Sequence, residues 1–276
     1  PNANITSRKD YNYSALTVAD LDNDGQMEII ASYDSLGIYI WRQDGTPFTT
    51  NPFWRAGDIN LGSAPVVCDL NGDGKKELVF SQHNVAVSHV YAISLEGDKT
   101  VDGWDGSQTI PYTTSYSLDH TLSVGDINND GHLEVVILGR GVVKAWNHMG
   151  KEIFSTPIDG LLPQIDWAAN VNTPILADVD GDAVPDIVFC CNNKFIYALH
   201  NDGSDILGFP IVSADEKFLD TPCVADIDND GRNEIIAGSE KDLYVWKTEG
   251  VPTAIEWSVM RGNPQNTGEY FPTVCK

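Results

Sequence analysis

Basic residues are scarce in this sequence, where 17 lysine and arginine side chains stand against 40 aspartate and glutamate side chains in 276 residues. The formal net charge is −23, and no basic stripe exists that would neutralise phosphate groups, which excludes nucleic acid as a partner. The sequence also lacks an apolar run of membrane-spanning length and any long stretch of helical periodicity. These absences predict an all-β chain without a transmembrane segment.

The motifs of several catalytic and metal–sulfur sites are missing too. The cysteines show no C-x-x-C spacing, which excludes zinc and redox motifs. We expect all but the last to be buried free thiols: Cys68, Cys190, Cys191 and Cys223, with Cys275 the fifth. The six histidines form no metal or general-base motif, and nucleophile-elbow, H-E-x-x-H and phosphate-loop motifs are absent. A signal peptide is absent as well, and we expect the chain that begins at Pro1 to be a processed or excised piece of a longer precursor.

What the sequence does contain is a nine-residue acidic loop in five copies, with carboxylate or amide side chains at positions 1, 3, 5 and 9. Ca²⁺ takes about six to eight oxygen ligands and tolerates irregular geometry, and a backbone carbonyl at position 7 would add one more oxygen. Glycine at position 6 permits the turn that directs these ligands inward. The predicted calcium ligands are Asp20, Asp22, Asp24, Gln26 and Glu28; Asp69, Asn71, Asp73, Lys75 and Glu77; Asp126, Asn128, Asp130, His132 and Glu134; Asp178, Asp180, Asp182, Val184 and Asp186; and Asp226, Asp228, Asp230, Arg232 and Glu234.

Two other interpretations of these loops compete with calcium binding of this kind. An EF-hand begins with the same residues, but its last ligand is at position 12 and helices flank it, whereas here the last acid is at position 9 and strands flank the loop. A single acidic turn is often a solvated loop without a metal, but five copies in register favour metal sites. The fourth loop has Ala183 in place of glycine and Pro185 at position 8, so we expect it to be the weakest or most distorted site.

The residues around each loop predict a repeated sheet. A short apolar run precedes each loop and a β-branched run follows it, which indicates two antiparallel strands joined by the loop. A third strand is expected to end at Gly45, Gly97, Gly150, Gly203 and Gly250, and a weaker fourth strand to contain Trp54, Trp104, Phe209 and Trp257. Near the end of the third strand, Trp41, Ile93, Trp146, Leu199 and Trp246 are expected to fill the core rather than to bind sugar.

Four strands in about 50 residues, repeated along the chain, are typical of the blades of a β-propeller. We therefore expect residues 1–276 to form one all-β propeller domain of four-stranded antiparallel blades. Five loops favour five blades, because a partial ring would expose an apolar face. Seven or eight blades remain the alternative if the chain is a fragment.

The charge of the chain also favours bound calcium. Five Ca²⁺ ions would reduce the net charge from −23 to about −13, and self-repulsion opposes folding of a highly charged chain. We expect chelation to destabilise the fold. Calcium at micromolar to millimolar concentrations is more available outside cells, which predicts an extracellular or periplasmic protein.

The element P-x-x-A-D-x-D-x-D-G-x-x-E-I-I, followed by a Y-x-W-x-x-x-G strand, resembles the FG-GAP/VCBS repeats of integrin-α-like β-propellers, and the resemblance covers nearly all of the chain. It implies that calcium lies in the hairpin between the first two strands of each blade, on the face away from the usual ligand surface. The segment Ile255–Tyr270 is similar to the ending of many secreted bacterial proteins with these repeats, which implies that residues 271–276 begin a linker.

The predicted function is that of a non-catalytic binding or adhesion module that recognises carbohydrate or an extracellular protein, as part of a larger secreted or surface protein. The candidate ligand-binding residues lie in the two longest inter-blade segments and are Tyr112, Tyr116, His120 and Trp167. For Trp167, packing between blades competes with a stacking role. The alternative function is a calcium-dependent polysaccharide lyase, since rhamnogalacturonan lyases resemble this chain in using the same loops.

Overall fold

The structure is a computed structural model. It describes residues 16–33, 37–50, 52–54, 60–61, 64–83, 87–96, 99–111, 122–139, 141–158, 173–190, 194–213, 217–218, 221–260, 262–263 and 267–270. Within these ranges every regular element is a β-strand, and all pairing between the named strands is antiparallel. The prediction of an all-β chain is confirmed for this part of the protein. It contains no helix that would reach across a lipid bilayer.

The strands form five sheets, which we number along the chain. Sheet 1 contains β1 (Thr17–Ala19), β2 (Glu28–Tyr33) and β3 (Gly37–Arg42); sheet 2 contains β4 (Asn60–Leu61), β5 (Val66–Cys68), β6 (Glu77–His83), β7 (Val87–Ser94), β8 (Lys99–Thr100) and β9 (Thr109–Pro111). Sheet 3 contains β10 (Leu122–Gly125), β11 (Glu134–Gly139), β12 (Val142–Asn147) and β13 (Glu152–Pro157). Sheet 4 contains β14 (Ile175–Ala177), β15 (Asp186–Cys190), β16 (Phe195–Leu199), β17 (Ile211–Val212) and β21 (Ile255–Trp257), and sheet 5 contains β18 (Cys223–Ala225), β19 (Glu234–Gly238) and β20 (Leu243–Lys247).

Each predicted loop joins two consecutive antiparallel strands, as the sequence indicated: β1–β2, β5–β6, β10–β11, β14–β15 and β18–β19. We call these the first and second strands of each sheet, and the next strand along the chain the third; the short β4 precedes this hairpin in sheet 2. The third strands end at Arg42, Ser94, Asn147, Leu199 and Lys247, so the prediction that they extend to the following glycine was wrong. Gly45, Gly150 and Gly203 instead close tight turns just after the strand, with φ angles of 81°, 69° and 83°. Only sheet 3 has four strands in simple order within the described residues, so four-stranded blades are not confirmed for the other sheets.

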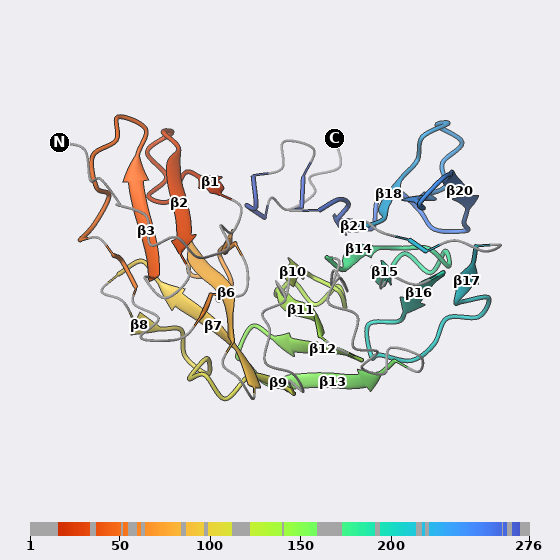
Figure 1. Cartoon of the computed structure of the whole chain (residues 1–276), viewed down its shortest axis with the longest axis horizontal. Helices are drawn as coiled ribbons and strands as arrows, with labels where there is room; N and C mark the ends of the chain where they lie inside the picture. The colour runs from red at the N-terminus through yellow and green to blue at the C-terminus, as the bar shows by residue number, and fades with distance from the viewer. Residues whose placement is uncertain are drawn as a thin grey trace.

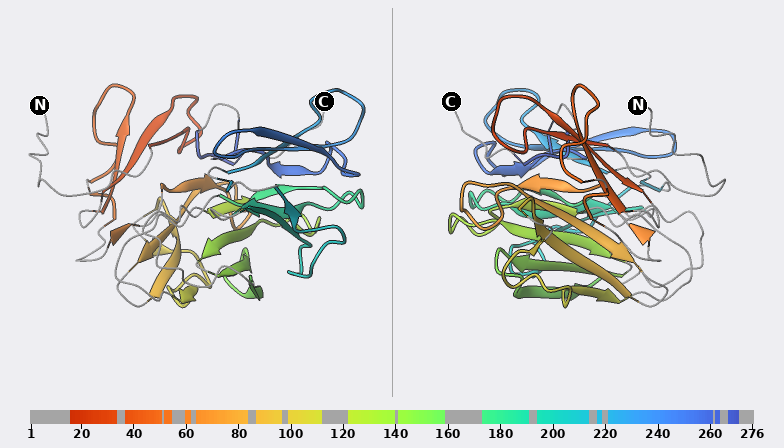
Figure 2. Two further views of the ribbon diagram at one scale, coloured as in Figure 1. Left: turned by 45° about the vertical axis from the view of Figure 1, so that its right-hand side comes forward. Right: turned by 90° about the vertical axis from the view of Figure 1, so that its left-hand side faces the viewer.

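The five sheets follow one another around an arc, with their first strands toward its inner side (Figure 1). Figure 2 shows the same arrangement from two further directions. The first strands of neighbouring sheets contact each other along the series β1, β5, β10, β14 and β18. Side-chain hydroxyls reinforce this series, since Thr17 donates to the Pro65 carbonyl (2.5 Å) and Ser123 donates to the Pro174 carbonyl. Apolar side chains between the sheets form the core, where Val135, Ile187 and their neighbours are fully buried.

The C-terminal segment lies across the inner strands of several sheets. β21 pairs with β14, and the Ser258 carbonyl accepts a hydrogen bond from Val224 of sheet 5 (3.1 Å). Further along, the Thr267 carbonyl accepts from Val18 of sheet 1 and the Gly268 carbonyl accepts from Val67 of sheet 2, both at 3.0 Å. This segment therefore lies between the two ends of the arc (Figure 1).

Sheet 5 leaves uncovered a face that is covered in the other four sheets. Ile227, at loop position 2, is 54% exposed, although its four counterparts are at most 4% exposed. In β20, Leu243 is 72% and Val245 is 49% exposed, and their counterparts in β3, β7, β12 and β16 are nearly fully buried. In each of sheets 1 to 4 the next sheet covers this face, whereas in sheet 5 no further sheet among the described residues covers it.

The predicted core residues and thiols are only partly as expected. Ile93, Trp146 and Leu199 are buried, whereas Trp41 and Trp246 are half-buried and stack on the tyrosine two residues earlier. Cys68 and Cys190 are buried and Cys223 is half-buried, and none of these three forms a disulfide. Cys191, Cys275 and the predicted linker at 271–276 lie outside the described residues.

Candidate metal centres

All five acidic loops share one network of local hydrogen bonds. The carboxylate at position 9 accepts from the backbone N–H of position 2, at 2.9 to 3.1 Å, and the carboxylate at position 5 accepts from the N–H of position 7, at 2.7 to 3.0 Å. The repetition of these bonds in five separate sheets shows that the nine residues encode the loop conformation locally.

The aspartate at position 1 completes this network in four of the loops. One of its oxygens accepts from the N–H of position 5 and the other from the N–H of position 6, at 2.8 to 3.1 Å. These bonds require a chain reversal, and positions 4 and 6 both have positive φ in every loop. Glycine at position 6 was expected from the motif, whereas position 4 was missed, although each copy has an asparagine or glycine there: Asn23, Gly72, Asn129, Gly181 and Asn229.

The acid at position 9 is the buried member of each loop. Glu28, Glu77, Glu134, Asp186 and Glu234 are all 0 to 1% exposed. Burial, with a smaller contribution from nearby loop aspartates, raises the pKa of Glu77 to about 7 and the pKa of Glu134 and of Asp186 to about 8. A carboxylate in this environment is costly unless a cation compensates it.

The unsatisfied atoms of the loops fit such a cation. Oε1 of Glu134 and Oε1 of Glu234 are buried without a hydrogen-bond partner among the described residues. Carboxylate oxygens also converge to within 4.8 Å of one another in the first, fourth and fifth loops, as Asp20–Asp22–Glu28, Asp178–Asp180–Asp182 and Asp226–Asp228–Asp230. The second and third loops have an amide at position 3, and the side-chain oxygens of Asn71 and Asn128 both accept from the N–H of position 5 at 2.9 Å. An oxygen-rich set of this kind suits a hard divalent cation.

In four loops the side chain at position 7 contacts the turn after the third strand, and Gln26 also donates to Asp24 of its own loop (3.2 Å). Gln26 accepts from Gln43 at 2.5 Å, Lys75 pairs with Glu96 at 2.8 Å, and Arg232 pairs with Glu249. His132 stacks on His148, with ring centroids 4.2 Å apart. Each partner outside the loop belongs to the turn after the third strand, so the side chain at position 7 ties this turn to the loop and only its backbone carbonyl is left for a metal.

A lysine competes for the fifth loop. Lys247, at the end of β20, places its Nζ 2.6 Å from Asp228 and 2.8 Å from Asp230. The hydrogen bond from Lys247 lowers the pKa of Asp230. All three side chains are substantially exposed, so the ammonium group can leave when a divalent cation binds.

The fourth loop differs from the others, and the difference begins at Asp178. Its Oδ1 accepts from the N–H groups of Asp180 (3.1 Å) and Gly181 (2.7 Å), and its Oδ2 accepts from Ala183 (3.1 Å) and Val251 (2.9 Å). Ala183 adopts a φ of 64° at the position that other loops give to glycine. The backbone network is therefore altered as the sequence suggested; that this loop binds calcium most weakly stays a prediction.

The structure also contains a cavity that the sequence did not indicate. It has a volume of about 590 Å³ and lies beside the fifth loop, where β18 and β21 meet the C-terminal segment; its lining includes Cys223, Val224, Ile255, Asn263 and Tyr270. These residues are distant in sequence, and only the long-range path of the C-terminal segment brings them together. The predicted ligand-binding residues Tyr112, Tyr116, His120 and Trp167 lie outside the described part of the chain.

Comparison with known proteins agrees with this architecture. The family model of the FG-GAP-like repeat matches residues 20–80 and 126–189. A search of curated protein sequences finds no match. Among solved structures, the chain is similar to the biofilm matrix protein Bap1 of V. cholerae, with a TM-score of 0.56 and 18% identity over 92% of this chain and 40% of that one.

Two further solved structures have the same general fold. A rhamnogalacturonan lyase PL11 of Bacillus licheniformis has a TM-score of 0.53 and 20% identity over 90% of this chain and 50% of that one. The Dos1 propeller has a TM-score of 0.51 and 11% identity, covering 87% and 56%. This chain spans less than two thirds of the length of each of these three proteins. It carries FG-GAP-like repeats over residues 20–80 and 126–189 and has a propeller-like all-β fold.

Proposed function

We propose that this chain is a calcium-stabilised, extracellular binding or adhesion module without catalytic activity, which recognises carbohydrate or a protein partner. The observation that supports it best is the buried carboxylate at position 9, present in all five loops; in Glu134 and Glu234 one of its oxygens has no hydrogen-bond partner within the described part of the chain. Up to five Ca²⁺ ions would compensate these carboxylates and stiffen the hairpin between the first two strands of each sheet.

The cavity between sheet 5 and the C-terminal segment supports the binding part of the proposal. A largely apolar hollow with a few polar groups is the usual form of a small-ligand site, and Asn263 and Tyr270 supply such groups here. The FG-GAP-like repeats and the similarity to the fold of a biofilm matrix protein are compatible with an extracellular location. The acidic charge of the chain favours a neutral sugar or a partner with a basic surface.

We further propose that the ring contains more than five blades. The uncovered apolar face of Ile227, Leu243 and Val245 has the pattern of a sheet that is covered by a following sheet. Sheet 1 has the complementary feature, because Val18 and Ile29 are half-buried where their counterparts in sheets 2 to 5 are buried. Two such faces at the ends of the arc favour the seven- or eight-bladed alternative over closure at five.

A glycan array in calcium and in chelator, at a temperature where both forms stay folded, tests the binding proposal. We expect calcium-dependent binding to one sugar class, and weaker binding by an Ala225→Leu variant that reduces the cavity. Leu207→Ala, which alters a fully exposed side chain, serves as the control. Silence on the array together with calcium-dependent capture of a defined protein would favour a protein partner. Unsaturated product from a rhamnogalacturonan substrate would overturn the non-catalytic assignment in favour of a lyase.

A further inference from the structure

We propose that the fourth loop is a transition-metal site rather than a fifth calcium site, with Asp180, Asp186 and His200 as its ligands. The inference rests on the proposed function only in taking the loops to be cation sites. It concerns which ion the fourth loop selects, and it names a ligand, His200, that lies outside the nine-residue motif.

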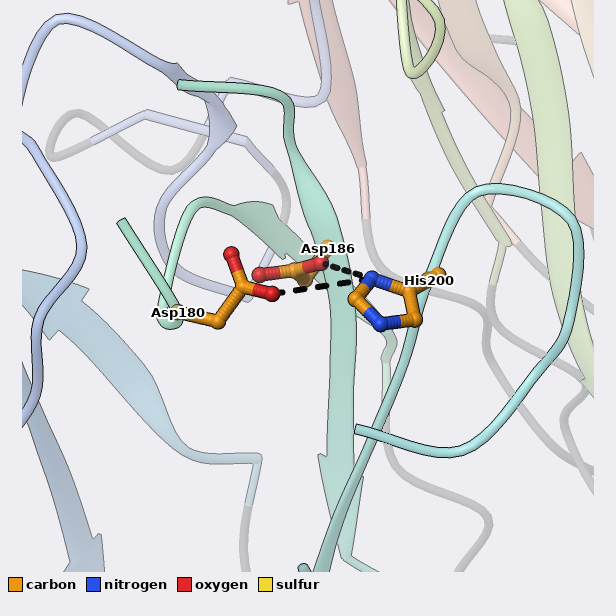
Figure 3. Close-up of side chains that lie close together, drawn as sticks. All are labelled: Asp180, Asp186 and His200. Carbon is orange, nitrogen blue, oxygen red and sulfur yellow. Dashed lines mark ion pairs between the residues drawn. The ribbon is translucent and has the colours of Figure 1, made fainter. Parts of the chain in front are cut away.

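The three side chains converge on one point from three separate segments (Figure 3). Nδ1 of His200 is 3.5 Å from Oδ1 of Asp186 and 3.7 Å from Oδ2 of Asp180. These separations exceed those of good hydrogen bonds, which are at most about 3.2 Å. They match the spacing of about 3.4 Å between two ligands of a tetrahedral ion that has bonds of about 2.1 Å.

The neighbouring backbone orients the two acids toward His200. Oδ2 of Asp186 accepts from the N–H of Val179 at 2.9 Å, and its other oxygen, Oδ1, faces the imidazole ring. Asp186 is almost fully buried, whereas His200 and Asp180 are partly exposed, so the cluster has a dry inner side and a solvent-accessible outer side. An ion can therefore enter from solvent and still bind a buried carboxylate.

The fourth loop has also lost an oxygen ligand that the other loops retain. Both oxygens of Asp178 accept two backbone N–H groups each, one of them from Val251 of sheet 5, and the residue is fully buried. In the other four loops the position 1 carboxylate accepts one N–H per oxygen from its own loop. Four donors satisfy the lone pairs of Asp178, so it is a poor ligand, and fewer oxygens disfavour calcium.

Among the five sheets, only sheet 4 has a histidine opposite the position 9 acid. The residue at the end of the third strand lies opposite the position 9 acid, as the pairs Glu28–Arg42, Glu77–Ser94, Glu134–Asn147 and Glu234–Lys247 show. In sheet 4, Ile187 pairs with Leu199, which places His200 opposite Asp186. The same position is thus a cation in sheets 1 and 5 and a neutral polar residue in sheets 2 and 3. Only sheet 4 supplies a neutral nitrogen donor.

A ligand set of one imidazole and two carboxylates suits a divalent ion such as Zn²⁺ or Co²⁺ better than Ca²⁺, which prefers a larger set of oxygens. Three protein ligands also leave one position of a tetrahedral ion open to water. The fourth loop would then hold its ion in the presence of the calcium that fills the other loops.

Co²⁺ is the probe of choice, because its visible absorption reports nitrogen ligation and coordination number. The purified chain is titrated with Co²⁺ in excess Ca²⁺, and Zn²⁺ is then added as a competitor. We expect one Co²⁺ per chain, displaced by Zn²⁺ but not by Ca²⁺. His200→Asn introduces the residue that sheet 3 has at this position, and it should weaken Co²⁺ binding by about tenfold or more. His148→Asn, which alters a histidine outside the cluster, should leave binding unchanged.

A gain of function completes the test. Asn147→His transfers the histidine to sheet 3, opposite Glu134, and should add a second Co²⁺ site of lower affinity, because Asp126 remains available there as a calcium ligand. Unchanged Co²⁺ binding by His200→Asn, or displacement of Co²⁺ by Ca²⁺, would overturn the inference. Calcium-induced stabilisation of His200→Asn is recorded in parallel. If calcium did not stabilise this variant, the result would count against the proposed calcium sites, and the transition-metal site would still be decided by the Co²⁺ titration.

Discussion

Replacing Glu134 with glutamine should have opposite effects on stability with and without calcium. Glu134 is fully buried, and burial raises its pKa to about 8 from 4.5, mainly by desolvation. At pH 8 without metal, the group is ionised in the unfolded chain but resists ionisation in the folded protein, and this difference lowers the free energy of unfolding by on the order of 4 kcal/mol. Glutamine removes this cost and retains an acceptor for the N–H of Ile127, but its amide adds a buried donor that costs about 1–3 kcal/mol. We expect a net gain of about 1–3 kcal/mol in chelator, or about 2–4 °C in Tm per kcal/mol.

Calcium should reverse this result, because glutamine is a weaker ligand than a carboxylate and calcium stabilises only the folded state. The pH dependence provides an independent check. Since the folded pKa of Glu134 lies above its unfolded value, the folded state binds more protons between pH 4.5 and about 8. In chelator the stability of the unmodified protein should therefore fall as pH rises through this window. The Glu134→Gln variant should show a shallower slope.

Thermal unfolding in chelator and in calcium, at several pH values, measures both effects. Glu240→Gln, at an exposed position in the same protein, is the matched control and should change Tm by less than about 1 °C in either condition. If Glu134→Gln destabilised the protein equally with and without calcium, the buried carboxylate would have a purely structural role and the metal assignment for this loop would be wrong.

Four further substitutions address single features of the fold. Asp226→Ala should lower Tm more in calcium than in chelator, where only its two hydrogen bonds to loop N–H groups are lost, and equal losses would contradict a metal role for the fifth loop. Lys247→Ala should tighten calcium binding in a calorimetric titration, because no ammonium group then competes with the ion. Ala183→Gly should raise the free energy of unfolding in urea by about 0.5–1 kcal/mol, since alanine is strained at a φ of 64°. Lys76→Met should cost about 3–5 kcal/mol in the same assay by leaving the carboxylate of Glu269 buried and unpaired, and adding Glu269→Gln should restore much of the loss.

The local parts of this structure could be predicted from the sequence, and the long-range parts could not. Each acidic loop and its two flanking strands are encoded by a contiguous stretch of about fifteen residues, so the residue spacing alone was enough to locate them. The ends of the third strands were misplaced, because glycines such as Gly150 mark the turn after the strand and look the same in sequence as a strand terminus. The path of the C-terminal segment, which joins Val18 and Val67 through Thr267 and Gly268, leaves no periodic signal.

The same division applies to the candidate sites. Position, spacing and residue type identified the motif carboxylates, including the buried Glu28 and Glu77. His200 was missed although the sequence carries a signal for it: it lies three residues before Gly203, and in every sheet the residue three before the closing glycine lies opposite the position 9 acid. The four N–H groups that bond to the carboxylate of Asp178 could not be predicted from the sequence, because one of the donors, Val251, is more than 70 residues away.

Sheet 5 separates two features of the fold, the closed acidic loop and the burial of the apolar sheet face. Glu234 is as buried as its counterparts in the other loops, and its bond to the N–H of Ile227 is of ordinary length. The side chain of Ile227 is nevertheless half exposed, because it faces the uncovered side of the sheet. The hydrogen-bond network of an acidic loop is therefore complete within one hairpin, whereas burial of the apolar face requires a neighbouring sheet. Calcium binding at the fifth loop should thus be independent of what covers Leu243 and Val245, so ring completion and metal binding can be measured as separate contributions to stability.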